Sequence, residues 1–150
     1  MKVTIYTDGA ASGNPGPGGY GVVLESSVGH RKELSGGFKR TTNNRMELLA
    51  VIKGLQELKS TEHRVEVVSD SKYVVDAINK GWLRNWVKKG FKDKKNPDLW
   101  RKLLPLLDKY HPVFTWVKGH NNHPQNERCD ALAVEASKSP NLPSDLGYQG

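Results

Sequence analysis

Two aspartates stand directly after predicted β-strands. Asp8 follows residues 3–7 and Asp70 follows residues 65–69, and both of these segments are rich in β-branched side chains. If the two strands are parallel neighbours, both carboxylates emerge at the same edge of a sheet, where α/β proteins place their ligands. A pair of carboxylates at that edge could bind a divalent cation.

Two further acidic residues lie early in predicted helices. Glu47 belongs to a helix expected at residues 43–59 and Asp130 to one expected at 125–138, each on the side that continues into apolar residues. Four carboxylates gathered at one place repel one another unless cations neutralise them. Oxygen ligands select hard ions such as Mg²⁺ or Mn²⁺, and two such ions about 3.5–4 Å apart are the usual device for cutting phosphodiesters.

Each carboxylate also has a structural interpretation. Asp8 and Asp70 could be turn residues or helix N-caps. Asn44 and Glu47 have the spacing of a capping box, and Asp130 could interact with a helix dipole. The hypothesis of a metal site therefore rests on the convergence of all four side chains, which depends on the order of the strands.

The elements that must position these residues are predicted from hydrophobic periodicity and turn residues. Three strands come first, and two later strands are reached across helices, which favours parallel pairing of those strands. The prediction is an α/β domain with a mixed five-stranded sheet flanked by helices. The remaining strands are expected at residues 19–26, 32–40 and 113–117, and the remaining helices at 71–80, within 82–96 and at 97–110, with Pro105 as a candidate kink.

The composition narrows the class of protein. The 150 residues fit one domain, and the formal charge of +7 suits a polyanionic partner. The single cysteine, Cys129, excludes an internal disulfide, and we expect it to be a small buried packing residue. No stretch resembles a signal peptide or a membrane span, so we expect a cytoplasmic protein that does not bind membranes, by default a monomer.

The positive charge is concentrated in residues 80–102. This segment contains nine Lys or Arg and two Asp, which gives it a net charge of +7, so the rest of the chain sums to zero. Trp82 and Trp86 are interleaved with its lysines, which include Lys88 and Lys89. Cations for phosphates and flat apolar groups for sugars or bases are the chemistry of sequence-independent nucleic-acid binding. The alternative is a solvated helix whose tryptophans belong to the core, as we expect for Trp100.

Four stretches of the chain, in order, resemble the motifs of bacterial type 1 ribonuclease H. They are VTIYTDGAASGNPGPGGYG, TTNNRMEL, VEVVSDSKYVVDAI and FTWVKGHNNHPQNERCDALA, and the resemblance runs from about residue 3 to about residue 137. It implies a ribonuclease H-like fold with strand order 3-2-1-4-5 and a catalytic domain at residues 1–138. The last residues, 139–150, contain two prolines and little to bury, so we expect a flexible tail.

The resemblance also assigns roles in the active site. It implies that Asp8, Glu47, Asp70 and Asp130 bind two Mg²⁺ ions when substrate is present, with Mn²⁺ able to substitute. It implies that His120, in the KGH motif, is a catalytic histidine that assists proton transfer or product release. From the residue alone, His120 would be a loop histidine without a role, and we expect His123 to be structural.

Substrate contacts follow from the same resemblance. Asn14, Asn43 and Asn44 match positions that contact RNA 2′-hydroxyls, and an amide can both donate and accept such bonds; alone, they would be a turn former and helix caps. The pocket for a DNA phosphate corresponds to Arg40, Thr42 and Asn96. The basic segment corresponds to a protrusion that holds the DNA strand, with Trp82, Trp86, Lys88 and Lys89. Lys72 departs from the uncharged amide of several relatives, and it could bind a phosphate instead.

The expected function is therefore metal-dependent, largely sequence-independent cleavage of the RNA strand of an RNA–DNA hybrid, leaving 5′-phosphate and 3′-hydroxyl ends. Two alternatives remain at this point. A nuclease or integrase-like enzyme acting on DNA shares the acidic chemistry but not the asparagines suited to 2′-hydroxyls. A hybrid-binding protein with an inactive site would not need all four carboxylates.

Overall fold

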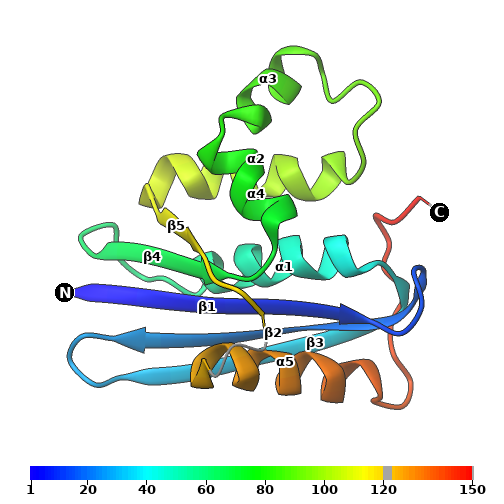
Figure 1. Cartoon of the computed structure of the whole chain (residues 1–150), viewed down its shortest axis with the longest axis horizontal. Coiled ribbons are helices and arrows are strands. Elements are labelled where there is room, and N and C mark those ends of the chain that lie inside the picture. The colour runs from blue at the N-terminus through cyan, green and yellow to red at the C-terminus, as the bar shows by residue number, and fades with distance from the viewer. Residues whose placement is uncertain (120–122, 150) are drawn as a thin grey trace.

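The computed structural model describes residues 1–119 and 123–149, in which one sheet carries helices on both faces (Figure 1). The strands and helices confirm the predicted α/β order. They are β1 (Lys2–Ala11), β2 (Gly16–Ser26), β3 (Arg31–Thr41), α1 (Asn43–Gln56), β4 (Arg64–Ser69), α2 (Lys72–Asn79), α3 (Trp82–Lys88), α4 (Pro97–Tyr110), β5 (Val113–Trp116) and α5 (Pro124–Ser137). Within the described ranges, no helix is long and apolar enough to cross a membrane.

The sheet has the predicted strand order, β3-β2-β1-β4-β5. The first three strands pair antiparallel, whereas β4 pairs parallel with both β1 and β5. Thr7 in β1 lies opposite Ser69 in β4. Asp8 follows Thr7 and Asp70 follows Ser69 in the sequence, so the parallel register brings the two aspartates to the same edge of the sheet.

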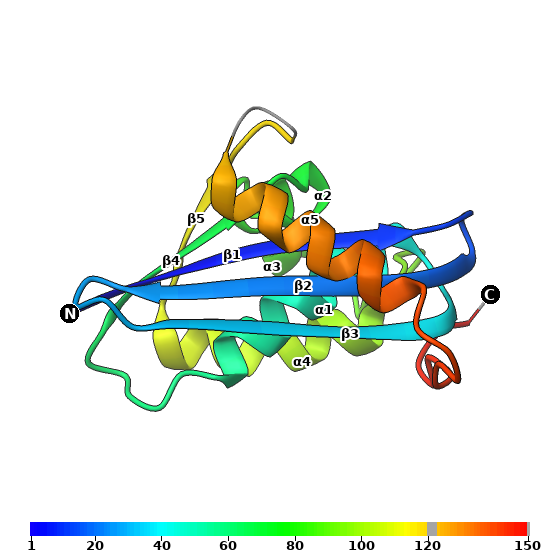
Figure 2. The same cartoon turned by 90° about the horizontal axis from the view of Figure 1, so that it is seen from below.

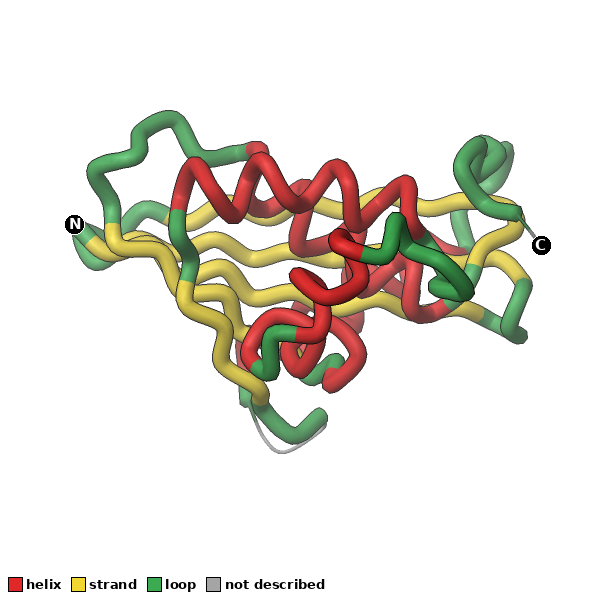
Figure 3. Tube along the Cα trace, turned by 90° about the horizontal axis from the view of Figure 1, so that it is seen from above, coloured by secondary structure: helices red, strands yellow, loops and turns green. Residues whose placement is uncertain are grey.

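The helices divide between the two faces of the sheet. Helix α5 packs across β1, β2 and β3 on one face, whereas α1 covers β1 and β2 on the other and is backed by α4 (Figures 2 and 3). The core lies mainly between the sheet, α1 and α4, and Trp100 of α4 is fully buried in it, as expected. Helix α2 contacts β4 and β5, whereas α3 and the loop after it stand away from the sheet and carry most of the basic segment (Figure 1).

The end of β1 and the path of α4 differ from the sequence-based expectation. Strand β1 does not end before Asp8 but continues to Ala11, because residues 8–11 pair with the glycine-rich start of β2. Asp8 is therefore held inside a strand rather than in a turn. Pro105 does not interrupt α4, which runs over all 14 residues from Pro97 to Tyr110.

The C-terminal segment also differs from the free tail suggested by its composition. The backbone amide of Lys39 donates to the carbonyl oxygen of Pro143 (2.9 Å). Arg45, whose side chain is only 2% exposed, forms ion pairs with Asp145 (2.7 Å) and Asp98 (2.8 Å). Long-range ion pairs, rather than apolar burial, hold the segment beside the start of α1, where Figure 1 shows the C-terminus.

This arrangement predicts a large contribution of Arg45 to stability. Arg45→Met should lower the free energy of unfolding by about 3 kcal/mol, because it leaves two partly buried carboxylates without their cation. Urea unfolding followed by circular dichroism measures this loss. Arg31→Met, which breaks an exposed ion pair with Glu33, should cost about 1 kcal/mol or less. Equal losses in the two variants would contradict a structural role for the buried network.

Candidate active site

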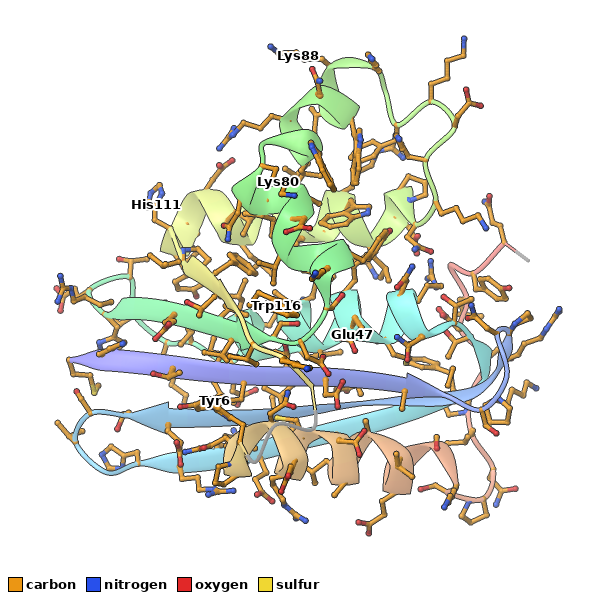
Figure 4. The ribbon with its side chains drawn as sticks, in the orientation of Figure 1. Tyr6, Glu47, Lys80, Lys88, His111 and Trp116 are labelled. Carbon is orange, nitrogen blue, oxygen red and sulfur yellow. The ribbon has the colours of Figure 1, made fainter. Side chains whose placement is uncertain are left out.

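Three of the four predicted carboxylates meet at one point. Asp8 (β1), Glu47 (α1) and Asp70 (just after β4) each place a carboxylate oxygen within 4.8 Å of the other two. Asp8 is 5% exposed and Glu47 is 3% exposed. Figure 4 shows Glu47 on α1, beside the sheet. Asp130 on α5 lies close enough for its charge to raise the pKa of Asp8.

Gly9 makes this meeting possible. Its backbone N–H donates to Asp8 Oδ1 (2.8 Å) and to Glu47 Oε1 (3.0 Å), so it joins the two carboxylates from different elements. A Cβ atom at this position would lie 2.4 Å from the backbone nitrogen of Glu47. Only glycine lets α1 approach β1 this closely. On the opposite face, a Cβ at Gly21 would lie 2.1 Å from the carbonyl oxygen of Cys129, so glycine also sets the approach of α5, which carries Asp130.

The helix-cap and helix-dipole interpretations of the carboxylates are wrong. Thr42, not Asn44, caps α1 by accepting a hydrogen bond from its first turn (3.2 Å), so Glu47 belongs to no capping box. Ser71 caps α2 (3.3 Å), which leaves Asp70 outside the cap. Asp130 is the seventh residue of α5, beyond the first turn in which the helix dipole acts.

The site strongly favours positive charge. Burial, together with the charges of Asp70 and Asp130, raises the pKa of Asp8 to about 7, although the hydrogen bond from the Gly9 backbone opposes the shift. Burial and the neighbouring Asp8 raise the pKa of Glu47 well above its usual range. In the described part of the chain, Glu47 Oε2 is buried without a hydrogen-bond partner. Such oxygens fit a hard divalent cation, which would neutralise the group and use the unpaired oxygen.

These shifts predict how stability depends on pH. A carboxyl whose pKa is raised on folding stabilises the native state below its unfolded pKa, near 4, and loses this contribution as pH rises through its folded pKa. In EDTA, the thermal midpoint should therefore fall between pH 4.5 and about 7.5. Mg²⁺ should reduce the fall, and Asp8→Asn should flatten it. A midpoint in EDTA that is constant over this range in the wild type would contradict the account.

Two residues beside Asp70 were not singled out from the sequence. The indole N–H of Trp116 donates to the backbone carbonyl oxygen of Asp70 (3.0 Å). A Cβ atom at Gly119 would lie 2.8 Å from Asp70 Oδ2, so the loop after β5 approaches this carboxylate closely. Both residues lie in the FTWVKGH stretch, and the resemblance of this stretch to a ribonuclease H motif was the signal that could have identified them. The predicted catalytic residue His120 lies outside the described residues.

The predicted RNA-contacting residues lie together at the start of α1. Asn14 Oδ1 accepts a hydrogen bond from the backbone N–H of Asn43 (3.3 Å), and Asn44 follows in the first turn of the helix. Because Thr42 supplies the cap, neither Asn43 nor Asn44 is needed as one. Their side chains are exposed at the surface.

The predicted residues for a DNA phosphate border one hollow. A pocket of about 590 Å³ is lined by Asn14, Thr42, Asn44 and Asn96, among others. Asn96 adopts a left-handed backbone conformation (φ 62°), and its side chain is fixed from both sides. Its Oδ1 accepts from Arg45 Nη1 (3.2 Å), and its Nδ2 donates to the hydroxyl of Tyr73 (3.1 Å). Arg40 is exposed at the end of β3, beside this pocket.

The first part of the basic segment, residues 80–96, forms a protrusion that includes α3 and the loop after it. Figure 4 shows Lys88 at its far end, away from the sheet. Trp86 packs edge-on against the core residue Trp100 (ring centroids 5.6 Å apart), whereas Trp82 is 44% exposed. Trp86 therefore extends the core, as the alternative interpretation expected, whereas Trp82 lies at the surface. The lysines are exposed at the surface; they are Lys80, Lys88, Lys89, Lys92, Lys94 and Lys95.

Some cations lie over aromatic rings. The ammonium of Lys72 lies 4.7 Å from the ring centroid of Trp116, which itself bonds to the backbone of Asp70. Lys94 lies similarly over Trp86, at 5.1 Å. Lys72 therefore lies over the ring that bonds to the backbone of Asp70.

The fold and the site define an α/β domain that gathers carboxylates at the carboxyl edge of a mixed sheet and presents cations and amides around them. The sequence profile of the RNase H family matches residues 1–138. The chain belongs to the RNase H family.

Individual relatives agree with this assignment over nearly the whole chain. It is 58% identical over 153 aligned residues to Ribonuclease H of Trichodesmium erythraeum, covering 99% of this chain and 96% of that protein. It is 59% identical to Ribonuclease H of Desulforamulus reducens, covering 97% and 93% of the two chains.

Solved structures support the same fold. LC9-RNase H1, a type 1 RNase H with the type 2 active-site motif, is 34% identical, with a TM-score of 0.79 over 90% of this chain and 71% of that one. LC11-RNase H1, solved in complex with RNA/DNA hybrid, is 31% identical, with a TM-score of 0.64 over 90% and 96% of the two chains.

Proposed function

We propose that this protein is an endonuclease that hydrolyses the RNA strand of RNA–DNA hybrids, with little sequence preference, leaving 5′-phosphate and 3′-hydroxyl ends. The observation that carries the proposal is the group of Asp8, Glu47 and Asp70, in which Asp8 and Glu47 are buried and Asp70 is half-buried. It lies in a chain that also presents asparagines and a basic protrusion. Membership of the RNase H family and the hybrid complex of LC11-RNase H1 support the same substrate.

Asp8, Glu47, Asp70 and Asp130 would hold two Mg²⁺ ions, which Mn²⁺ could replace. When bound, such ions supply an activated water and stabilise the leaving oxygen. The chain positions the carboxylates through the N–H of Gly9 and through the indole of Trp116 on the backbone of Asp70. Because the pKa of Asp8 and that of Glu47 are raised, binding of a cation competes with protonation of these carboxylates. We assign His120 to proton transfer or product release.

The surface around the acidic group distinguishes the two strands. Asn14, Asn43 and Asn44 would bind 2′-hydroxyls, which only the RNA strand carries. Arg40, Thr42 and Asn96 would bind a phosphate of the DNA strand, and Lys72 a phosphate of the RNA strand. The DNA strand would continue along the protrusion, with Lys88 and Lys89 at its phosphates and Trp82 and Trp86 against its sugars.

The test is cleavage of an end-labelled RNA–DNA hybrid with Mg²⁺ and with EDTA, beside single-stranded RNA, RNA duplex and DNA duplex. We expect metal-dependent loss of the RNA strand of the hybrid alone. Cleavage of the DNA duplex would favour a DNA nuclease instead. Binding of the hybrid without cleavage of any substrate would favour a hybrid-binding protein.

We further infer that the protein acts as a monomer in the cytoplasm, without an obligate protein partner. Cys129, the single cysteine of the chain, is buried and has a raised pKa because of burial, which suits a packing role in a reducing compartment. Light scattering of the purified protein tests the monomeric state. A stable dimer at micromolar concentration would contradict it.

A further inference from the structure

The C-terminal segment, here residues 143–149, lies against the residues that would bind a DNA phosphate. Its first contact is with the end of β3. Pro143 accepts the backbone hydrogen bond of Lys39 (2.9 Å), and Asp145 Oδ2 accepts from the hydroxyl of Thr41 (2.7 Å). Thr41 is fully buried between Arg40 and Thr42. These bonds therefore fix the short stretch of backbone that carries two of the three phosphate-binding candidates.

The second contact reaches the third candidate, Asn96, through a buried cation. Asp145 forms two hydrogen bonds with Arg45, from Nε (2.7 Å) and from Nη2 (3.0 Å). The Nη1 atom of the same guanidinium donates to Asn96 Oδ1 (3.2 Å) and to Asp98 (2.9 Å). Burial of the guanidinium would lower the pKa of Arg45, but the hydrogen bonds to Asp98 and Asp145 outweigh it and raise the pKa above its usual value. The guanidinium is planar and rigid, so holding one end of it orients the other.

The third contact is an aromatic ring. Tyr148 is half-buried, and its ring centroid lies 5.9 Å from Cζ of Arg40 and 5.8 Å from Cζ of Arg45. Guanidinium groups within about 6 Å of a ring are attracted to its face. Together with Gly147 and Gln149, Tyr148 lines the pocket of about 590 Å³ that Thr42 and Asn96 also line.

The two arginines differ in whether a carboxylate neutralises their charge. Arg45 is offset by Asp98 and Asp145. Arg40 is exposed, and among the described residues it has no carboxylate partner. The ring of Tyr148 therefore restrains an arginine whose charge is still available to an anion. An ordered guanidinium loses less entropy on binding a phosphate than a freely moving one.

We propose that the C-terminal segment forms part of the DNA-strand binding site, in which Tyr148 is a positioning residue for Arg40 and Asp145 positions Asn96 through Arg45. This inference rests on the proposed function. A segment that only stabilised the fold would change the unfolding free energy, but it would not change sensitivity to one particular DNA phosphate.

The experiment uses the full-length chain and hybrid substrates whose DNA strand carries a single uncharged methylphosphonate. A scan of its position with the wild type finds the phosphate whose neutralisation raises KM most. Tyr148→Ala should raise KM for the unmodified hybrid about fivefold, with a change in kcat of less than about twofold. In this variant, a methylphosphonate at that position should raise KM much less than it does in the wild type.

Two matched variants separate positioning from stability. Tyr148→Phe keeps the ring and should restore both KM and the methylphosphonate penalty on KM. Val28→Ala changes an apolar side chain that is 63% exposed in the turn between β2 and β3, outside this segment, and it should behave as the wild type. Assays are run well below the thermal midpoint of every variant. If Tyr148→Ala does not fold, Tyr148→Leu fills the space without an aromatic face and serves the same comparison.

Wild-type KM and a full methylphosphonate penalty in Tyr148→Ala would overturn the inference. A wild type that leaves the hybrid uncut would instead overturn the proposed function. The two failures are distinguishable because the first requires a wild type that cleaves hybrids.

Discussion

Asp70→Asn is expected to abolish hybrid cleavage, with a loss in kcat of at least about 1,000-fold, while the protein stays folded. The amide keeps the shape of the side chain but removes a negative charge from the group that would hold the metals. That charge raises the pKa of both Asp8 and Glu47. Because the variant relieves this repulsion, its thermal midpoint in EDTA should equal or exceed that of the wild type.

The control is the same Asp→Asn substitution at a position outside the acidic group. Asp108→Asn changes an exposed residue of α4 and should leave both activity and midpoint unchanged. Single-turnover cleavage in Mg²⁺ and differential scanning calorimetry in EDTA provide the two measurements. A marked loss of folding in Asp70→Asn would show that the carboxylate is structural. Residual activity near that of the wild type would remove it from the metal site.

Replacing five lysines of the protrusion by alanine is expected to weaken hybrid binding strongly at low salt. The positions are Lys88, Lys89, Lys92, Lys94 and Lys95, all of which are exposed. Each phosphate contact contributes about 0.9 to the slope of the logarithm of the binding constant against the logarithm of salt concentration. If most of these lysines bind phosphates, the slope should become shallower by about 3 to 4.

Fluorescence anisotropy with a labelled hybrid in Ca²⁺ or EDTA, at several salt concentrations, measures this slope. Lys109→Ala combined with Lys138→Ala removes exposed lysines from elsewhere and should change the slope by less than about 1. An unchanged slope in the fivefold variant would exclude the protrusion from substrate binding. Its stability should stay within about 1 kcal/mol of the wild type, because the lysines are on the surface.

The sheet and the acidic edge were predictable because local signals agreed with one another. β-Branched runs marked the strands, and helices between the later strands required parallel pairing. Once β1 and β4 are parallel neighbours in register, Asp8 and Asp70 must lie at one edge. Glu47 was expected to face the sheet because its helix continues into apolar residues, and its burial confirms this.

The N-cap of α1 and the contacts of the C-terminal segment could not be predicted from such local signals. Capping-box spacing between Asn44 and Glu47 arises by chance, and only the bond from Gly9 to Glu47 shows where this side chain points. The contacts of Asp145 join residues about 100 positions apart in the chain. A polar segment with two prolines carries no periodic signal, so ion pairs with a buried arginine are visible only in three dimensions.

The measurement that tests the central claim most directly is the chemistry of the cut ends. The hybrid is cleaved in water enriched in ¹⁸O with Mg²⁺, and the RNA products are analysed by mass spectrometry. Hydrolysis by an activated water predicts 3′-hydroxyl ends and one ¹⁸O atom in each new 5′-phosphate, with an intact DNA strand. Products that end in a 2′,3′-cyclic phosphate, or labelled phosphates on the DNA strand, would contradict the account.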